Sequence, residues 1–115
     1  MFMVLLQVAL GGAIGSVLRF LTVASIGAPV ATLIVNVVGS FAMGVLFILL
    51  SARLAPLFMT GVLGGFTTFS AFSLDALKLY QSGQTAQAAL YVAASVLLSL
   101  IAVAAGAALA QRGLA

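Results

Sequence analysis

The residues that decide the fold are Gly61-Val62-Leu63-Gly64-Gly65-Phe66-Thr67-Thr68-Phe69-Ser70-Ala71-Phe72-Ser73. Three glycines within five residues weaken a helix by about 1 kcal/mol each relative to alanine. The flanking residues 54–58 and 74–79 are nevertheless largely apolar. In lipid, a helix interruption survives only where neighbouring protein, a bound ion or a wet cavity satisfies the freed backbone groups. Hydroxyl groups at positions 67, 68, 70 and 73 suit that task, so we expect a membrane helix broken near residues 64–68.

The composition is that of a membrane protein. Of 115 residues, 65% are hydrophobic and only 4% are charged, far outside the range of soluble globular domains. The charged residues leave uncharged runs at 1–18, 20–52, 54–74 and 79–111, each near or above the ~20 residues that span a bilayer. The first run lacks the basic start of a signal peptide, so we expect it to remain as a helix. The sequence thus predicts an all-α membrane protein with one transmembrane domain, residues 1–115, and helices at about 2–24, 29–50, 55–80 and 86–109.

Several kinds of chemistry are excluded by what the chain lacks. Cysteine and histidine are absent, which removes disulfides and thiolate or imidazole ligands and bases. The net charge of +3 comes from four scattered cations, so it predicts no nucleic-acid surface. The only acid, Asp75, falls near the end of an apolar run. Proton relays in membranes usually need a carboxylate or histidine chain, so the sequence argues against proton coupling.

Two expected helices carry polar tracks. On the second helix, Thr32, Asn36 and Ser40 share one face at i, i+4 and i+8. A buried asparagine amide must use its two N–H donors to avoid a desolvation penalty. Such an amide either binds a solute or hydrogen-bonds a neighbouring helix, and the pattern leaves both open. The fourth helix repeats the spacing with Tyr91, Ser95 and Ser99.

The first helix carries Gly11, Gly15 and Arg19 at successive i, i+4 positions. The glycines are typical of a close helix-packing seam. Arg19 near the helix end either extends to the lipid headgroups or lines an entrance for anions, and the sequence does not separate the two.

Aromatic and charged residues follow the glycines. Phe69 and Phe72 face the same way if the helix resumes after Thr68. Their ring edges carry partial positive charge and could assist an anion, although phenylalanines at this spacing often serve packing alone. Asp75 and Lys78, at i and i+3, can pair near the membrane edge.

The basic residues do not fix an orientation. Four spans place Arg53 and Arg112 on one side and Arg19 and Lys78 on the other, so the positive-inside rule gives two against two. A chain without bias inserts both ways, and two opposite copies form the inverted pair that many transporters encode in one polypeptide. We therefore expect an antiparallel, dual-topology homodimer with a pathway that suits an anion.

The motifs of three helices closely resemble those of the Fluc (CrcB) fluoride channel family, and the resemblance covers essentially all four helices. The residues that carry it are Gly12-Ala13-x-Gly15-x-x-x-Arg19-Phe20, Thr32-x-x-x-Asn36-x-x-Gly39-Ser40-Phe41-x-x-Gly44 and Gly64-Gly65-Phe66-Thr67-Thr68-Phe69-Ser70-Ala71-Phe72-Ser73. Two positions depart from the family pattern. Ala71 stands where relatives commonly have a hydroxyl, and Asp75 replaces a frequent glutamate.

The resemblance implies a fluoride-selective channel, not an enzyme, that gives passive fluoride export and resistance to fluoride. It implies a multi-pass protein of the cell inner membrane, whose partners are a second copy of itself, fluoride, sodium and lipid. The dimer would have two pores and a structural sodium ion at its centre, bound by the backbone carbonyls of Gly64 and Thr67 from both subunits. The implied fluoride path uses Asn36, Phe69 and Phe72, with Thr32, Ser70, Tyr91, Ser95 and Ser99 along it and Arg19 towards the vestibule.

Two other functions were weighed against this one. A small dual-topology four-helix multidrug exporter has a similar size but needs a membrane-embedded carboxylate in its first helix, and residues 1–24 contain none. A non-transporting membrane scaffold would use the polar tracks for helix packing only.

Overall fold

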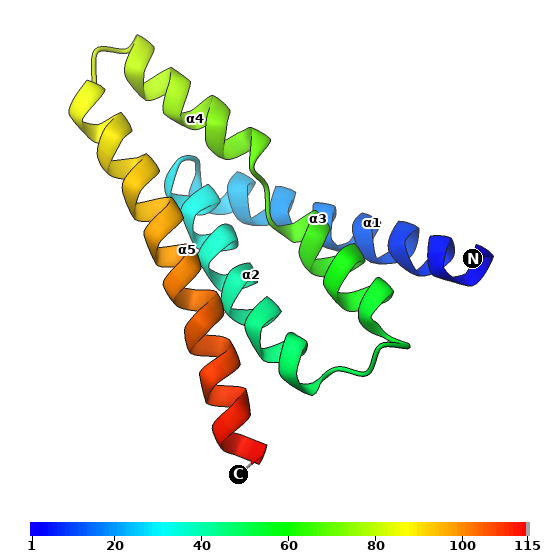
Figure 1. Cartoon of the computed structure of the whole chain (residues 1–115). Coiled ribbons are helices and arrows are strands. Elements are labelled where there is room, and N and C mark those ends of the chain that lie inside the picture. Colours follow the sequence, from blue (N-terminus) through cyan, green and yellow to red (C-terminus); the bar gives the residue numbers. More distant parts are fainter. Residues whose placement is uncertain (115) are drawn as a thin grey trace.

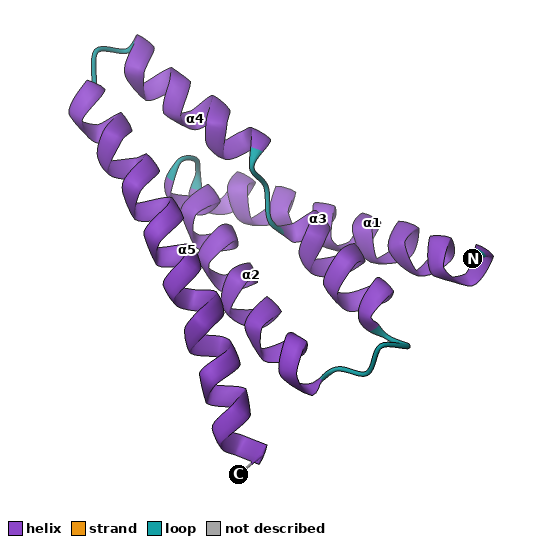
Figure 2. Cartoon of the chain, viewed as in Figure 1, coloured by secondary structure: helices purple, strands orange, loops and turns teal. Residues whose placement is uncertain are grey.

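The computed structural model describes residues 1–114 and is built of helices and loops, with no strand in that part of the chain (Figure 2). Four helical segments are long and apolar enough to cross a membrane: Phe2–Ile26, Val30–Leu49, Pro56–Gln81 and Thr85–Leu114. Large apolar side chains cover the outside of all four, as a lipid-facing protein requires. The prediction of an all-α protein with four membrane-capable helices is confirmed.

The first two helices end at clear backbone signals. Helix α1 (Phe2–Ile26) stops at Gly27, whose φ of 92° is a conformation that favours glycine. Helix α2 (Val30–Leu49) starts directly after Pro29. Helix α5 (Thr85–Leu114) extends beyond the expected end at residue 109. Its last turns are rich in alanine and place Arg112 in the final turn, where a cation favours the C-terminal end of the helix dipole.

The third span consists of three pieces. Element η1 (Pro56–Leu63) is a π-helix that runs into the short helix α3 (Gly64–Phe66), and α4 (Ser70–Gln81) follows after three non-helical residues, 67–69. Thr67 is extended, with φ −88° and ψ 159°. Figure 1 shows this link as a thin connection between two helical pieces that are offset from one another. The sequence placed the interruption near 64–68, whereas the two central glycines lie in helix and the non-helical residues come after them. We call residues 67–69 the break.

The helices form two closely packed pairs (Figure 1). In the first pair, α1 lies along η1 and α3, where Gly11 faces Gly61. A Cβ built on Gly61 would lie 2.8 Å from the Cα of Gly11, so neither position has room for a side chain. The Gly11-x-x-x-Gly15 seam expected from the sequence is therefore a contact within one chain.

The second pair is α2 with α5, and it also meets at glycines. A Cβ on Gly44 would overlap the carbonyl oxygen of Val103, and one on Gly106 would overlap that of Phe41. Both helices contribute small buried residues, so their backbones lie in direct contact. Helix α4 crosses from the first pair to pack beside the N-terminal part of α5 (Figure 1). The break therefore lies where the two pairs meet.

Candidate functional site

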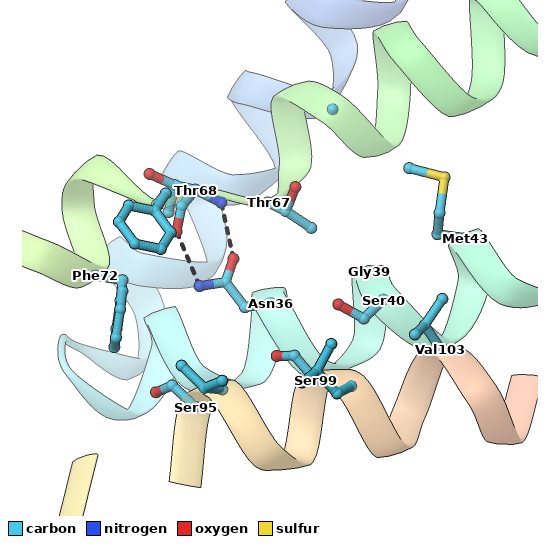
Figure 3. Close-up of a pocket in the computed structure, with 14 residues that line it drawn as sticks. Asn36, Gly39, Ser40, Met43, Thr67, Thr68, Phe72, Ser95, Ser99 and Val103 are labelled. Atoms are coloured by element: carbon cyan, nitrogen blue, oxygen red, sulfur yellow. Dashed lines mark hydrogen bonds between the residues drawn. The ribbon is translucent and has the colours of Figure 1, made fainter. Parts of the chain in front are cut away.

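An open groove of about 500 Å³ lies between the break, α2 and α5. Figure 3 shows α2 and α5 supplying one wall and the break the other. Its apolar lining is interrupted by a few polar groups, and no acidic or basic side chain lines it. The lining residues are Asn36, Gly39, Ser40, Met43, Gly64, Thr67, Thr68, Phe69, Phe72, Ser95, Val96, Ser99, Leu100 and Val103.

Asn36 ties α2 to the break through both ends of its amide. Its Nδ2 donates to the carbonyl oxygen of Thr68 at 2.9 Å, and its Oδ1 accepts the backbone N–H of Thr68 at 2.8 Å (Figure 3). These partners fix which end of the amide is nitrogen. Because the backbone N–H occupies the Oδ1 acceptor, the polar hydrogen that remains for the groove is the second Nδ2 hydrogen. Asn36 thus offers the groove a donor.

The backbone of the break leaves carbonyls without their helical donors. In an α-helix the N–H of Thr68 would bond to Gly64, and that of Ala71 to Thr67. Here the Thr68 N–H goes to Asn36, and the Ala71 N–H goes to the Thr68 hydroxyl at 3.1 Å. Within residues 1–114, the carbonyl oxygens of Gly64 and Thr67 accept no hydrogen bond. Gly64 is also exposed on this chain.

The serines of α5 form the far wall of the groove. Ser95 is 5% exposed, and its Oγ has no hydrogen-bond partner among the described residues. Ser99 lies one turn further along α5, and Ser40 faces it from α2 (Figure 3). A buried hydroxyl without a partner costs free energy, which points to a function or to a ligand that completes it.

Three aromatic rings contact one another in series at one end of the groove. Phe69 and Phe72 meet edge to face, with ring centroids 5.4 Å apart and an interplanar angle of 72°. Phe72 then contacts Tyr91, at 5.3 Å between centroids. Phe72 is 7% exposed, whereas Phe69 is 76% exposed. Phe72 is therefore a core residue as well as part of the lining, and Phe69 projects beyond the chain.

Beyond the rings, the hydroxyl of Tyr91 donates to Oδ2 of Asp75 at 3.1 Å. Asp75 is 9% exposed and faces α5, while Lys78 is exposed. The pairing with Lys78 that the spacing allows is not formed within residues 1–114, where the carboxylate turns inward to the tyrosine. Thr32, at 1% exposure, is buried beside this group at the α2 end.

The predicted path residues divide into two groups. Asn36, Phe69, Phe72, Ser95 and Ser99 line the groove together with Gly64 and Thr67. Thr32, Ser70, Tyr91 and Arg19 do not line it, and the Nε of Arg19 donates to the carbonyl oxygen of Gly65 at 3.1 Å.

Some lining residues are absent from the predicted path. The lining adds Thr68 and Met43, together with Val96, Leu100 and Val103. The helical spacing of Met43 from Asn36, i to i+7, was a signal for it. Thr68 belongs to the predicted break, but no residue pattern indicated that it lines the groove.

Comparison with known proteins gives a consistent result along the whole chain. The family model described as CrcB-like protein, Camphor Resistance (CrcB), matches residues 6–107. A protein of Cereibacter sphaeroides named fluoride-specific ion channel FluC is 58% identical over 113 residues, which cover 89% of this chain and 90% of the relative. Relatives with the same name from Paracoccus denitrificans and Rhizobium etli are 52% and 50% identical, covering 88% and 86% of this chain and 89% of each relative. The resemblance that the three motifs indicated is confirmed, and the chain belongs to the CrcB-like family.

Proposed function

We propose that this chain forms a fluoride-selective ion channel that allows passive fluoride export and so protects the cell against fluoride. The observation that carries the proposal is the groove itself, where the fixed Nδ2 donor of Asn36 and the unpartnered hydroxyl of Ser95 line one apolar space. The names of its relatives, fluoride-specific ion channels, support fluoride as the ion.

The polar groups of the groove favour an anion over a cation. Asn36 presents N–H, because its oxygen is bonded to Thr68. The hydroxyl of Ser95 can turn its hydrogen towards a solute, as can that of Ser99. No carboxylate lines the groove to attract a cation. Channels select ions by replacing hydration water with fixed groups of suitable charge, and small donors in an apolar space suit a small anion with strong acceptor strength, such as fluoride.

The functional unit in this proposal is an antiparallel homodimer of dual topology in the inner membrane, with two pores. One chain leaves the groove open and Phe69 projecting outward at 76% exposure. A second copy would close the groove and cover this ring. The even distribution of basic residues between the two sides of the four spans supports opposite orientations.

We further propose that one sodium ion holds the dimer together at its centre. Among residues 1–114, no three acidic, histidine or cysteine side chains gather into a metal site, so a cation must use the backbone. The carbonyls of Gly64 and Thr67 accept no hydrogen bond within the described chain. Two copies would supply four such oxygens, which suit a hard cation.

The test of the channel function is a liposome efflux assay. Purified protein in vesicles loaded with fluoride should release it when valinomycin and potassium balance the charge, and chloride-loaded vesicles should keep their chloride. Fluoride retention by vesicles that contain folded dimer would contradict the channel and favour a scaffold.

The orientation is tested separately with a thiol label. The chain contains no cysteine, so Gln84→Cys in the α4–α5 loop provides a single reporter. A membrane-impermeant maleimide should label about half of the protein from each face if both orientations occur. Labelling from one face alone would contradict dual topology.

A further inference from the structure

The side chain of Arg19 reaches across from α1 to the residue that precedes the break by two positions. Its Nε–H donates to the carbonyl oxygen of Gly65 at 3.1 Å, in a partly buried position. Arg19 does not line the groove. Its contact is therefore with the backbone of the third span and not with the space that a solute would occupy.

The close packing of α3 on α1 brings this carbonyl within reach. A Cβ on Gly65 would lie 2.7 Å from the carbonyl oxygen of Gly12 and 3.1 Å from the backbone nitrogen of Ser16. Only glycine allows this approach. The carbonyl of Gly65, which Arg19 binds, is thus held at a fixed position along the axis of α1.

Gly65 needs such a donor because of the break. In a continuous helix its carbonyl would accept the N–H of Phe69, but no backbone bond joins them here. Within the break, the carbonyl of Thr68 is satisfied by Asn36. Side chains from two helices thus hold this segment in place, with Arg19 of α1 on the residue before Phe66 and Asn36 of α2 on the middle of the break.

We propose that Arg19 is a positioning residue that fixes the break through its Nε–H, and that its positive charge is not what conduction requires. Holding Gly65 sets the direction of the adjoining Gly64 and Thr67 carbonyls and of Phe69. This inference rests on the proposed channel function. The competing role is an electrostatic one, in which the guanidinium concentrates anions at an entrance.

Three substitutions separate the donor from the charge. Arg19→Gln removes the charge and places its amide nitrogen at the same distance along the side chain as the arginine Nε. Arg19→Lys keeps the charge but has a methylene at that position, with its ammonium further out. Arg19→Met removes both and retains an unbranched apolar chain of similar shape.

The experiment measures fluoride efflux from liposomes, at low and high ionic strength, for the wild type and the three variants. If Arg19 positions the break, Arg19→Gln should keep at least about half of the wild-type efflux rate. Arg19→Lys and Arg19→Met should lower that rate about tenfold or more, the range expected for a lost charge-assisted hydrogen bond. The losses should not depend on salt, because screening acts on charge attraction. Retained flux in Arg19→Lys with loss in Arg19→Gln would overturn the proposal.

A second measurement does not depend on fluoride flux. Hydrogen exchange of the backbone amides at residues 67–72 should remain slow in Arg19→Gln and become faster in Arg19→Lys and Arg19→Met, relative to wild-type dimer of the same elution volume. Unchanged exchange in all three variants would overturn the proposal even if the wild type conducts. Absence of flux in the wild type, with the predicted exchange pattern, would count against the channel function and not against the role of Arg19.

Discussion

Asn36 and Thr68 are joined by a two-point hydrogen bond that links the two helix pairs of the fold. The amide nitrogen of Asn36 meets the Thr68 carbonyl at 2.9 Å, and the amide oxygen meets the Thr68 N–H at 2.8 Å. The backbone of the break therefore cannot shift along α2 without loss of both bonds. The same geometry engages Oδ1 with Thr68 and leaves the second Nδ2 hydrogen as a donor for the groove, so the position of the break and the proposed preference for an anion both depend on this side chain.

Replacement of Asn36 by aspartate should abolish fluoride flux. The carboxylate keeps the acceptor for the Thr68 N–H but loses the Nδ2 donor and places negative charge in the groove. A partly buried carbonyl left without its donor costs at most about 1–3 kcal/mol, so the melting temperature should fall as well. Efflux and thermal unfolding measure the two effects. Thr22→Ala is the control, because the Thr22 hydroxyl bonds only to its own helix. Fluoride flux near wild type in Asn36→Asp would contradict the donor role of the amide.

Removal of the Ser95 hydroxyl should separate stability from conduction. Ser95 Oγ is buried without a partner, so Ser95→Ala deletes an unsatisfied polar atom and should leave the free energy of unfolding unchanged or raise it by up to about 1–3 kcal/mol. Fluoride efflux should fall, because one of the few donors in the groove is lost. Ser25→Ala provides the matched control, since the Ser25 hydroxyl bonds to the Leu21 carbonyl on an exposed face. A loss of stability would indicate a hidden partner for Ser95.

The two phenylalanines should respond differently to substitution. Phe69 is largely exposed on the single chain while Phe72 is buried against Tyr91. Phe72→Ala should destabilise the protein by about 3–5 kcal/mol, as expected for a large core truncation. Phe69→Ile should reduce fluoride flux with a much smaller change in the melting temperature of the detergent-solubilised protein. Equal destabilisation by both would show that Phe69 is packed as tightly as Phe72 in the assembled protein.

Much of this fold follows from the sequence, and the reasons for the remainder are physical. The uncharged runs locate all four spans, since length and apolarity suffice for that. The i, i+4 spacing places Asn36, Ser95 and Ser99 on polar tracks, the resemblance adds them to the predicted path, and all three line the groove. The bond from Arg19 to Gly65 was not predictable, because it depends on how far α1 and α3 are shifted along one another. Periodicity likewise cannot show that Asp75 binds Tyr91 of α5 and not Lys78 of its own helix. The spacing alone allows either partner.

The π-helix η1 and the exact position of the break were also not predictable from the sequence. The glycines at 61, 64 and 65 read as the site of interruption. In the structure they remain helical, and α1 packs directly on the backbone of Gly61 and Gly65, where a side chain would not fit. Tertiary packing thus overrides the low helix propensity of glycine, and the chain leaves the helix only at Thr67, where that packing ends.

The glycine contact between α2 and α5 predicts a position-dependent effect of alanine. Gly106→Ala should destabilise the protein by about 1–3 kcal/mol, because the added methyl overlaps the carbonyl of Phe41 and forces the helices apart. Gly113→Ala, on the same helix, meets nothing within 4 Å and should be neutral or slightly stabilising through better helix propensity. Thermal unfolding of both variants checks this. Equal melting temperatures would contradict the close approach of the two backbones.

Sodium removal tests the proposed cation site at the dimer centre. The carbonyls of Gly64 and Thr67 accept no hydrogen bond within the described chain, so an ion that occupies them should stabilise the dimer by mass action. Exchange of sodium for N-methylglucamine should lower the melting temperature and reduce fluoride efflux, and returned sodium should restore both. Potassium at equal ionic strength is the control, because it separates binding of a particular ion from general screening. The same melting temperature in all three salts, at low protein concentration and after extensive dialysis, would exclude an exchangeable stabilising cation.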